Sequence, residues 1–171
     1  FAGTVNAAVV TGGRNGSAGA EATTKEWNGT DWSTGGSLIT ARSSFAGMLG
    51  SQNAAKHMGG TANTFPQQCV NVEDYNGTSF ATGTPLLVGT ELFSGAGTQN
   101  AGISTGGQTD AENPTPKTHE WNGISFNQTA NLVNGRKTND IADGSQSSFQ
   151  VSSGGNFAST TCVKTEQYTT T

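Results

Sequence analysis

The fold is decided by one stretch of sequence, Cys69-Val70-Asn71-Val72-Glu73-Asp74-Tyr75-Asn76-Gly77-Thr78-Ser79-Phe80. Residues 69–75 alternate between two faces, with Glu73 and Tyr75 on one and Val72 and Asp74 on the other, which is the period of a β-strand. Asn-Gly follows, the strongest short-range hairpin signal, because a type I′ turn requires positive φ at both central residues. We therefore predict a strand over 69–75, a tight turn and a returning strand over 78–82.

The same pattern recurs about every 47 residues along the chain. Each copy has a Gly-Ser/Thr-x-Asn-Ala turn, as at Gly50–Ala54, then a Gly-Gly pair, an aromatic residue and a second aromatic residue. The glycine pairs begin at Gly12, Gly59, Gly106 and Gly154, the first aromatics are Trp27, Tyr75, Trp121 and Tyr168, and the second are Trp32, Phe80 and Phe126. Such recurrence indicates a supersecondary unit copied in tandem.

Each repeat is predicted to be a four-stranded antiparallel meander. In the second copy, runs of small and apolar residues predict strands at 45–49 and 54–58, besides the two strands of the hairpin. A leucine (Leu38, Leu86 or Leu132) closes each repeat and leads into the next. Ordering one repeat costs on the order of 50–90 kcal/mol of backbone entropy, which its few large side chains cannot offset alone. Neighbouring copies must therefore pack together, and we predict an all-β propeller, with a stacked β-solenoid as the alternative.

The chain is a single array of repeats, which span about residues 1–47, 48–94, 95–141 and 142–171. The last repeat is incomplete, so the array holds about 3.6 units. Propellers close with about four to eight blades, and neither end of the sequence falls on a repeat boundary. We therefore expect this sequence to be part of a longer polypeptide.

A strand ending in Gly-Gly, a polar loop and two spaced aromatic residues resembles the kelch repeat, whose period is about 50 residues. The pattern is present as Met58-Gly59-Gly60 with Tyr75 and Phe80, and as Val10-Thr11-Gly12-Gly13 with Trp27 and Trp32. The motif Glu-Trp-Asn-Gly-Thr-x-Trp is also similar to degenerate kelch-like repeats in proteins of aquatic bacteriophages and bacteria. The resemblance implies a β-propeller. This sequence departs from the family in one respect, because the residues before its Gly-Gly pairs are more polar than is usual.

Composition excludes two classes of partner. The chain of 171 residues carries eight Lys and Arg and a formal net charge of −4. So few basic residues form no stripe that could follow a nucleic acid, and no apolar run approaches membrane-spanning length. We therefore predict neither a nucleic-acid partner nor membrane insertion.

No motif for catalysis or metal binding stands out. Galactose oxidase belongs to the propeller family that the resemblance indicates, and its copper site uses tyrosine, histidine and a Cys–Tyr crosslink. Here Tyr75 and Tyr168 occupy the places of packing aromatics, while His57 and His119 belong to different blades. Zinc spacings, phosphate-binding loops and nucleophile elbows are absent from the sequence. We predict no enzyme activity, no cofactor and no metal.

Several charged residues and the cysteines fall on repeat positions and are interpreted as structural. Arg42 and Arg136 lie between repeats, where an arginine could bond carbonyl groups of neighbouring strands. Cys69 and Cys162 are equivalent positions two repeats apart, too far for a disulfide, and are interpreted as separate buried thiols. The carboxylates on the third strands are interpreted as a solvated face rather than a glycosidase pair; they are Glu26, Asp74, Glu120 and Glu166.

The loops between the second and third strands differ most among the copies, and loops on a rigid scaffold are where binding usually resides. We therefore predict that a ligand contacts Arg14, Asn15, Gln67, Gln68, Asp110, Glu112 and Asn156. The predicted function is non-enzymatic: a structural, receptor- or glycan-binding propeller of a virion (a tail fibre or similar) or extracellular appendage. Its partners would be copies of itself, other appendage proteins and surface glycans. The alternatives are the propeller portion of a secreted carbohydrate-active enzyme, galactose-oxidase-like or a glycosidase, with catalytic residues elsewhere, and an intracellular kelch adaptor.

Overall fold

The computed structural model describes residues 1–16, 19–44, 47–62, 68–109, 113–138, 141–145, 148–151, 156–157, 160–161 and 165–169. Within these ranges the chain is all-β and contains no helix, so none that is long and apolar enough to cross a membrane. Five residues singled out in the sequence lie outside the described ranges: Gln67, Asp110, Glu112, Gly154 and Cys162.

The strands form three four-stranded sheets and one three-stranded sheet, each an antiparallel meander in chain order, as predicted. The first sheet contains β1 (Ala2–Thr4), β2 (Ala7–Thr11), β5 (Thr24–Trp27) and β6 (Trp32–Thr34). The second contains β7 (Gly47–Ser51), β8 (Ala54–Met58), β9 (Val72–Tyr75) and β10 (Phe80–Thr82). The third contains β11 (Glu91–Gly97), β12 (Gly102–Gln108), β13 (Thr118–Trp121) and β14 (Phe126–Gln128). The fourth contains β15 (Ile141–Ser145), β16 (Ser148–Val151) and β19 (Glu166–Thr169).

Two of the loops between second and third strands contain small hairpins where only a polar loop was predicted. In the first sheet, β3 (Arg14–Asn15) pairs with β4 (Gly19–Ala20). In the fourth, β17 (Asn156–Phe157) pairs with β18 (Thr160–Thr161).

The Asn-Gly hairpins differ from the predicted type I′ turn. The first one turns over residues 28–31, so that Trp27 and Trp32 face each other across the two strands. Gly29 has a positive φ of 95°, but Asn28 does not. Instead, Asn28 Oδ1 accepts hydrogen bonds from the backbone N–H groups of Thr30 and Asp31, both at 2.9 Å. The prediction of two positive φ angles was wrong because the asparagine side chain stabilises an Asx turn.

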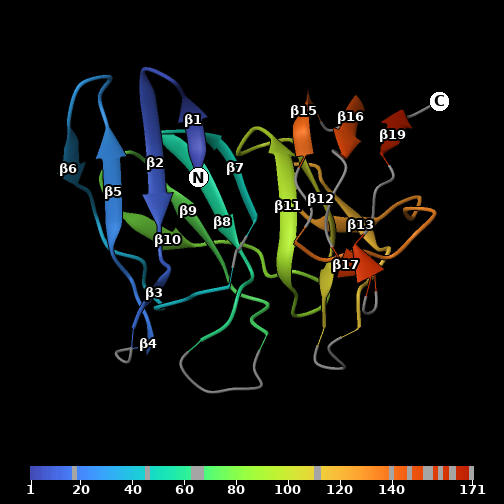
Figure 1. Cartoon of the computed structure of the whole chain (residues 1–171). Helices are drawn as coiled ribbons and strands as arrows, with labels where there is room; N and C mark the ends of the chain where they lie inside the picture. The colour runs from blue at the N-terminus through green and yellow to red at the C-terminus, as the bar shows by residue number, and fades with distance from the viewer. Residues whose placement is uncertain are drawn as a thin grey trace.

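The four sheets stand side by side with their first strands toward the middle of the molecule (Figure 1). Strand β7 packs against β1 on one side and β11 on the other, and β11 packs against β15. The later strands lie at the periphery, with β6 at the left edge of Figure 1 and β19 at the right. The sheets do not close into a ring.

Neighbouring sheets bury apolar side chains against each other. Burying one large side chain contributes about 1.5–3 kcal/mol, so the sheets stabilise one another, as predicted. The linker leucines Leu38, Leu86 and Leu132 are all buried. The clusters contain Ala2, Val9, Met48, Ala55 and Tyr75 between the first and second sheets, Leu49, Met58, Val72, Leu86, Phe93, Trp121 and Phe126 between the second and third, and Ile103, Leu132 and Ile141 between the third and fourth.

A glutamine in the turn between the first and second strands ties a sheet to the one before it. Gln52 Nε2 donates to the carbonyl oxygens of Ala8 and Trp27, at 3.2 and 2.8 Å. Gln99 makes the equivalent two bonds to the second sheet, both of 2.9 Å. In the first sheet the same turn position holds Val5, which has no side-chain amide to donate.

The Gly-Gly pairs lie where the linker to the next sheet crosses the end of a second strand: β2 and β8 end directly before their pairs, whereas β12 runs through its pair to Gln108. Gly59 has a φ of 64°, and a Cβ atom there would lie 2.4 Å from the carbonyl oxygen of Thr90. The N–H of Gly60 donates to that same carbonyl at 2.9 Å. Gly13 and Gly107 make the equivalent bonds in the first and third sheets. The close approach of two backbones therefore requires glycine.

The aromatic residues of the first sheet are not buried, contrary to the prediction that these residues pack between blades. Trp32 is 54% exposed, whereas Phe80 and Phe126 pack between sheets. In the second and third sheets, the face that carries these aromatics lies against the preceding sheet. No described segment covers that face of the first sheet, so Trp27 is only half-buried and Trp32 remains exposed.

Candidate functional site

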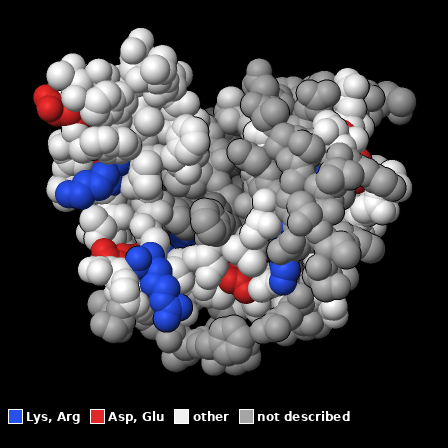
Figure 2. Space-filling model, viewed as in Figure 1, with Lys and Arg blue, Asp and Glu red and all other residues white. Residues whose placement is uncertain are grey.

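The linkers and the loops between second and third strands lie on one side of the sheets, which we call the loop face. The loop face is at the bottom of Figure 1, where β3 and β4 lie. The first turns and the Asn-Gly hairpins lie on the opposite side. Figure 2 shows few charged side chains in this view, and most of them lie in its lower half. Because the linkers lie on the loop face, the polar side chains at their inner ends are the candidates for binding.

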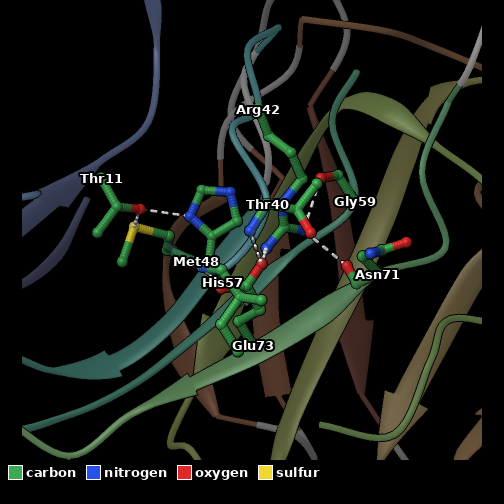
Figure 3. A network of polar contacts seen from close by, with 9 residues as sticks. Thr11, Thr40, Arg42, Met48, His57, Gly59, Asn71 and Glu73 are labelled. Atoms are coloured by element: carbon green, nitrogen blue, oxygen red, sulfur yellow. Dashed lines mark hydrogen bonds and ion pairs between the residues drawn. The ribbon is translucent and has the colours of Figure 1, made fainter. Parts of the chain in front are cut away.

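Arg42 anchors the first linker to the second sheet (Figure 3). Its side chain is fully buried, and Nη1 donates to the carbonyl oxygens of Gly59 and Asn71 at 3.0 and 2.7 Å. Nη2 donates to Glu73 Oε1 at 2.9 Å. Burial lowers the pKa of the Arg42 guanidinium, and the Glu73 carboxylate opposes that shift. The predicted bonding of this arginine to neighbouring carbonyls is confirmed.

Both oxygens of Glu73 are occupied by the same linker. Oε2 accepts the backbone N–H of Ile39 at 2.7 Å, and Oε1 accepts that of Thr40 at 3.1 Å as well as the guanidinium. A buried carboxylate with this many donors is satisfied, so the linker is locked in place and Glu73 is structural.

The same latch recurs between the third and fourth sheets. Arg136 donates to Glu166 Oε1, and Glu166 Oε2 accepts the backbone N–H of Val133 at 2.6 Å. Between the second and third sheets the equivalent residues are Thr90 and His119, which form no such ion pair. In the described part of the chain, the arginine latch therefore occupies alternate contacts between sheets.

Two of the carboxylates that the sequence placed on a solvated face, Glu26 and Glu166, in fact bond to a neighbouring sheet or its linker. Asp74 instead accepts a bond within its own sheet, from the buried Lys56 of the neighbouring strand, at 2.6 Å. Glu26 of the first sheet accepts the hydroxyl of Tyr75 from the second. The interpretation was wrong for Glu26 and Glu166 because each side chain faces a neighbouring sheet or its linker, which supplies a hydrogen-bond donor.

His57 lies buried between the first and second sheets. Its Nδ1 is hydrogen-bonded to Thr11 Oγ1, which also contacts Met48 Sδ at 3.6 Å (Figure 3). Its Nε2 is buried with no hydrogen-bond partner. Burial, reinforced by the positive charge of Arg42, lowers the pKa of His57 well below its usual range. Among the described residues no three His, Cys, Asp or Glu side chains gather as metal ligands would.

A group of four polar side chains, which we call the Glu91 cluster, lies on the loop face between the second and third sheets. Glu91 is buried, and its Oε1 accepts bonds from Gln68 Nε2 at 2.9 Å and Gln108 Nε2 at 2.6 Å. Lys137, from the linker to the fourth sheet, donates to Gln108 Oε1. Gln68 Oε1 is buried without a hydrogen-bond partner. Such unsatisfied oxygens are uncommon in proteins, so the fold leaves one acceptor of this cluster unpaired.

Backbone strain accompanies this cluster. Ser44, Leu92 and Thr138 occupy equivalent repeat positions, Leu92 as the second residue of β11, and have positive φ angles of 66°, 56° and 56°. They are bonded head to tail, because the Leu92 N–H donates to the Ser44 carbonyl at 3.1 Å and the Thr138 N–H to the Leu92 carbonyl at 2.8 Å. Strain of this kind costs on the order of 1–3 kcal/mol per residue and concentrates at functional sites. Glu91 and Lys137 each directly precede a strained residue, so the strained backbone at these two positions orients both charges.

Only one of the residues predicted to contact a ligand belongs to the Glu91 cluster, namely Gln68. Arg14 and Asn15 are exposed in β3, over the first sheet, and Asn156 lies in β17. The remaining three, Gln67, Asp110 and Glu112, lie outside the described residues. Cys69, predicted to be a buried thiol, is half-buried at the end of the same loop.

Sequence reasoning missed the other three members of the cluster. Glu91 and Lys137 share a repeat position with Ser43, directly after the position of Arg42. The signal in the sequence would have been this one repeat position, which changes from Ser43 to Glu91 to Lys137 in copies that are otherwise similar. Gln108 follows the glycine pair of the third repeat, where the second repeat has Thr61.

No family model and no curated protein matches this chain. Among solved structures, the chain is similar to the one titled "Structure of YjhT", with a TM-score of 0.72 at 13% sequence identity. The match covers 88% of this chain and 50% of that one, so it spans about half of that protein. At this identity the likeness shows the fold alone.

Proposed function

We propose that this chain is part of a kelch-like β-propeller that binds carbohydrate on its loop face, without catalysing a reaction, on a virion or an extracellular appendage. The observation that carries the binding role is the Glu91 cluster, with its unpartnered Gln68 oxygen. Two amides, one carboxylate and one ammonium group come together there from both flanking sheets and a linker.

The propeller assignment is supported by how the sheets are arranged. Successive four-stranded sheets lie side by side with their first strands innermost, as blades do around an axis. The match to about half of a solved chain of the same fold leaves room for further blades. The kelch marks, the glycine pairs and the aromatic pairs, occupy equivalent places in successive sheets.

Carbohydrate is supported by the chemistry of the cluster. Sugar hydroxyl groups both donate and accept hydrogen bonds, and planar amide and carboxylate groups offer donors and acceptors at fixed positions. The low formal net charge of −4 argues for a ligand that is mostly neutral. A binding role is favoured over a catalytic one because Glu73 and Glu91 are each committed to bonds within the fold.

The test is a glycan array with the protein, followed by calorimetry with the best-binding sugar. Gln68→Ala removes the free acceptor, and we expect about a tenfold loss of affinity, since one polar contact contributes roughly 0.5–1.5 kcal/mol. Lys137→Met should weaken binding similarly. Gln128→Ala is the matched control, because Gln128 is exposed on the peripheral strand β14. A blank array, or equal losses for Gln68→Ala and Gln128→Ala, would contradict the proposal.

A further inference from the structure

A small cavity lies between the second and third sheets, at the contact where Thr90 and His119 replace the arginine latch. Leu86 and Phe93 form its apolar wall, and Thr90, Ser104 and His119 supply polar groups. The room in it for the centre of a water molecule is about 10 Å³. A cavity needs roughly this much room to hold one water molecule, so a larger ligand does not fit.

The repeat explains why a cavity forms at this place. Three of the residues that line it occupy the repeat positions of the arginine latch: Thr90 that of Arg42, His119 that of Glu73 and Gly106 that of Gly59. In the latch, the Arg42 guanidinium donates to the Gly59 carbonyl oxygen at 3.0 Å. A threonine side chain ends well short of where a guanidinium would lie, so the place of that group remains open between the second and third sheets.

His119 contributes an unpaired polar atom to this cavity. The residue is only 8% exposed, and its Nε2 is buried with no hydrogen-bond partner in the protein. The Thr90 hydroxyl donates to the Val88 carbonyl oxygen at 3.0 Å, so its oxygen can still accept a bond. Ser104, directly opposite His119 in the register of β12 and β13, carries a further hydroxyl. A buried water molecule typically makes about three hydrogen bonds to groups of this kind.

We propose that this cavity binds one water molecule, which bonds to His119 Nε2 and Thr90 Oγ1 in the place that the guanidinium takes in the latch. An apolar occupant would leave Nε2 buried and unsatisfied, which costs free energy. The water molecule exchanges with solvent, whereas an ion pair is a fixed part of the chain. The second linker is thus joined to the third sheet by an exchangeable bridge. This inference does not depend on carbohydrate binding.

The test is rotating-frame Overhauser spectroscopy of the whole chain in water, which detects protons close to a bound water molecule. We expect cross-peaks between the water resonance and the methyl groups of Leu86. The methyl groups of Leu49 are the internal control, because Leu49 is buried in the same apolar cluster but does not line the cavity. They should give no such cross-peak.

Two variants show whether the histidine holds the water molecule. His119→Leu should abolish the Leu86 cross-peaks, because a cavity with too few polar partners stays dry. His57→Leu is the matched control: His57 is also buried with an unpartnered Nε2, but it lies between the first and second sheets. This variant should keep the Leu86 cross-peaks.

A crystal structure of the wild type is the second measurement, because an exchanging Thr90 hydroxyl proton can relay the signal and His119→Leu could fail to fold. We expect density for a water molecule within about 3.2 Å of His119 Nε2. A well-defined cavity without that density would overturn the proposal. Equal cross-peaks to Leu86 and Leu49, no cross-peak to Leu86 in the wild type, or cross-peaks that persist in His119→Leu would overturn it as well.

Discussion

The guanidinium of Arg42 and the carboxylate of Glu73 lie 2.9 Å apart with both side chains buried, although one belongs to a linker and the other to the next sheet. A linker is usually the least restrained part of a repeat protein. Here it is held by an ion pair that is also bonded to backbone: Arg42 Nη1 donates to two carbonyl groups, and Glu73 accepts from two N–H groups of the linker. These contacts of the linker set the angle between the two sheets.

Replacing Arg42 with Met should destabilise the protein severely. The change leaves Glu73 buried without its cation, and removing one partner of a buried pair typically costs about 3–5 kcal/mol. The measurement is the free energy of unfolding in urea. Arg14→Met is the control, because Arg14 is exposed, and it should change stability by less than about 0.5 kcal/mol. Equal losses for the two variants would show that the latch contributes little.

Acid should weaken the contact between the first two sheets through His57. The folded protein holds this ring neutral, because burial lowers its pKa well below the usual range. The unfolded chain takes up a proton near pH 6.5. Below that pH the unfolded state therefore binds more protons, and the free energy of unfolding falls by up to about 1.4 kcal/mol per pH unit.

His57→Gln should remove this share of the pH dependence between pH 7 and pH 5.5, as measured by urea unfolding at each pH. His119, whose pKa burial also lowers, supplies a second share that His57→Gln leaves intact. If His57→Gln and His119→Gln each kept the wild-type dependence of the free energy of unfolding on pH, the neutral buried histidines would not be its cause.

Gly47 has no room for a side chain. A Cβ atom there would lie 2.4 Å from Cε2 of Phe93, in the first strand of the next sheet. We expect Gly47→Ala to destabilise by about 1–3 kcal/mol through overpacking. Phe93→Leu should partly relieve the clash, so the double variant should be more stable than the sum of the single changes predicts. Simple additivity in this double-mutant cycle would contradict the close contact.

Gln52→Ala should cost about 1–3 kcal/mol, because it removes two hydrogen bonds between sheets and takes one donor from each of two carbonyl groups. Gln128→Ala, at an exposed position, should be close to neutral in the same unfolding experiment. A neutral Gln52→Ala would mean that water replaces the amide without loss.

Local pattern was enough to predict the sheets. Residues 54–58 form β8 with the predicted bounds, because small and apolar residues there run directly into a glycine pair. The strand expected over 69–75 is shorter, since Cys69 donates to the Gly60 carbonyl and Val70 accepts from the linker residue Leu86. Those bonds come from segments distant in sequence, and alternation alone carries no information about them.

The candidate site was largely hidden from the sequence for the same reason. Glu91, Gln108 and Lys137 come from three different segments and meet only after the sheets have packed. The strained φ angles fall on Ser44, Leu92 and Thr138, residue types that give no hint of a left-handed conformation. Only Gln68 could be found, because it lies in a loop that differs between copies.

The bonds that join Ser44, Leu92 and Thr138 head to tail have an evolutionary consequence. At this position each repeat donates an N–H to the carbonyl of the repeat before it and accepts the N–H of the repeat after it. Successive repeats are therefore joined by the same kind of bond. A duplication or deletion of one whole repeat in the gene would preserve that connection. Lineages could thus vary the number of modules while the centre of the molecule keeps its design.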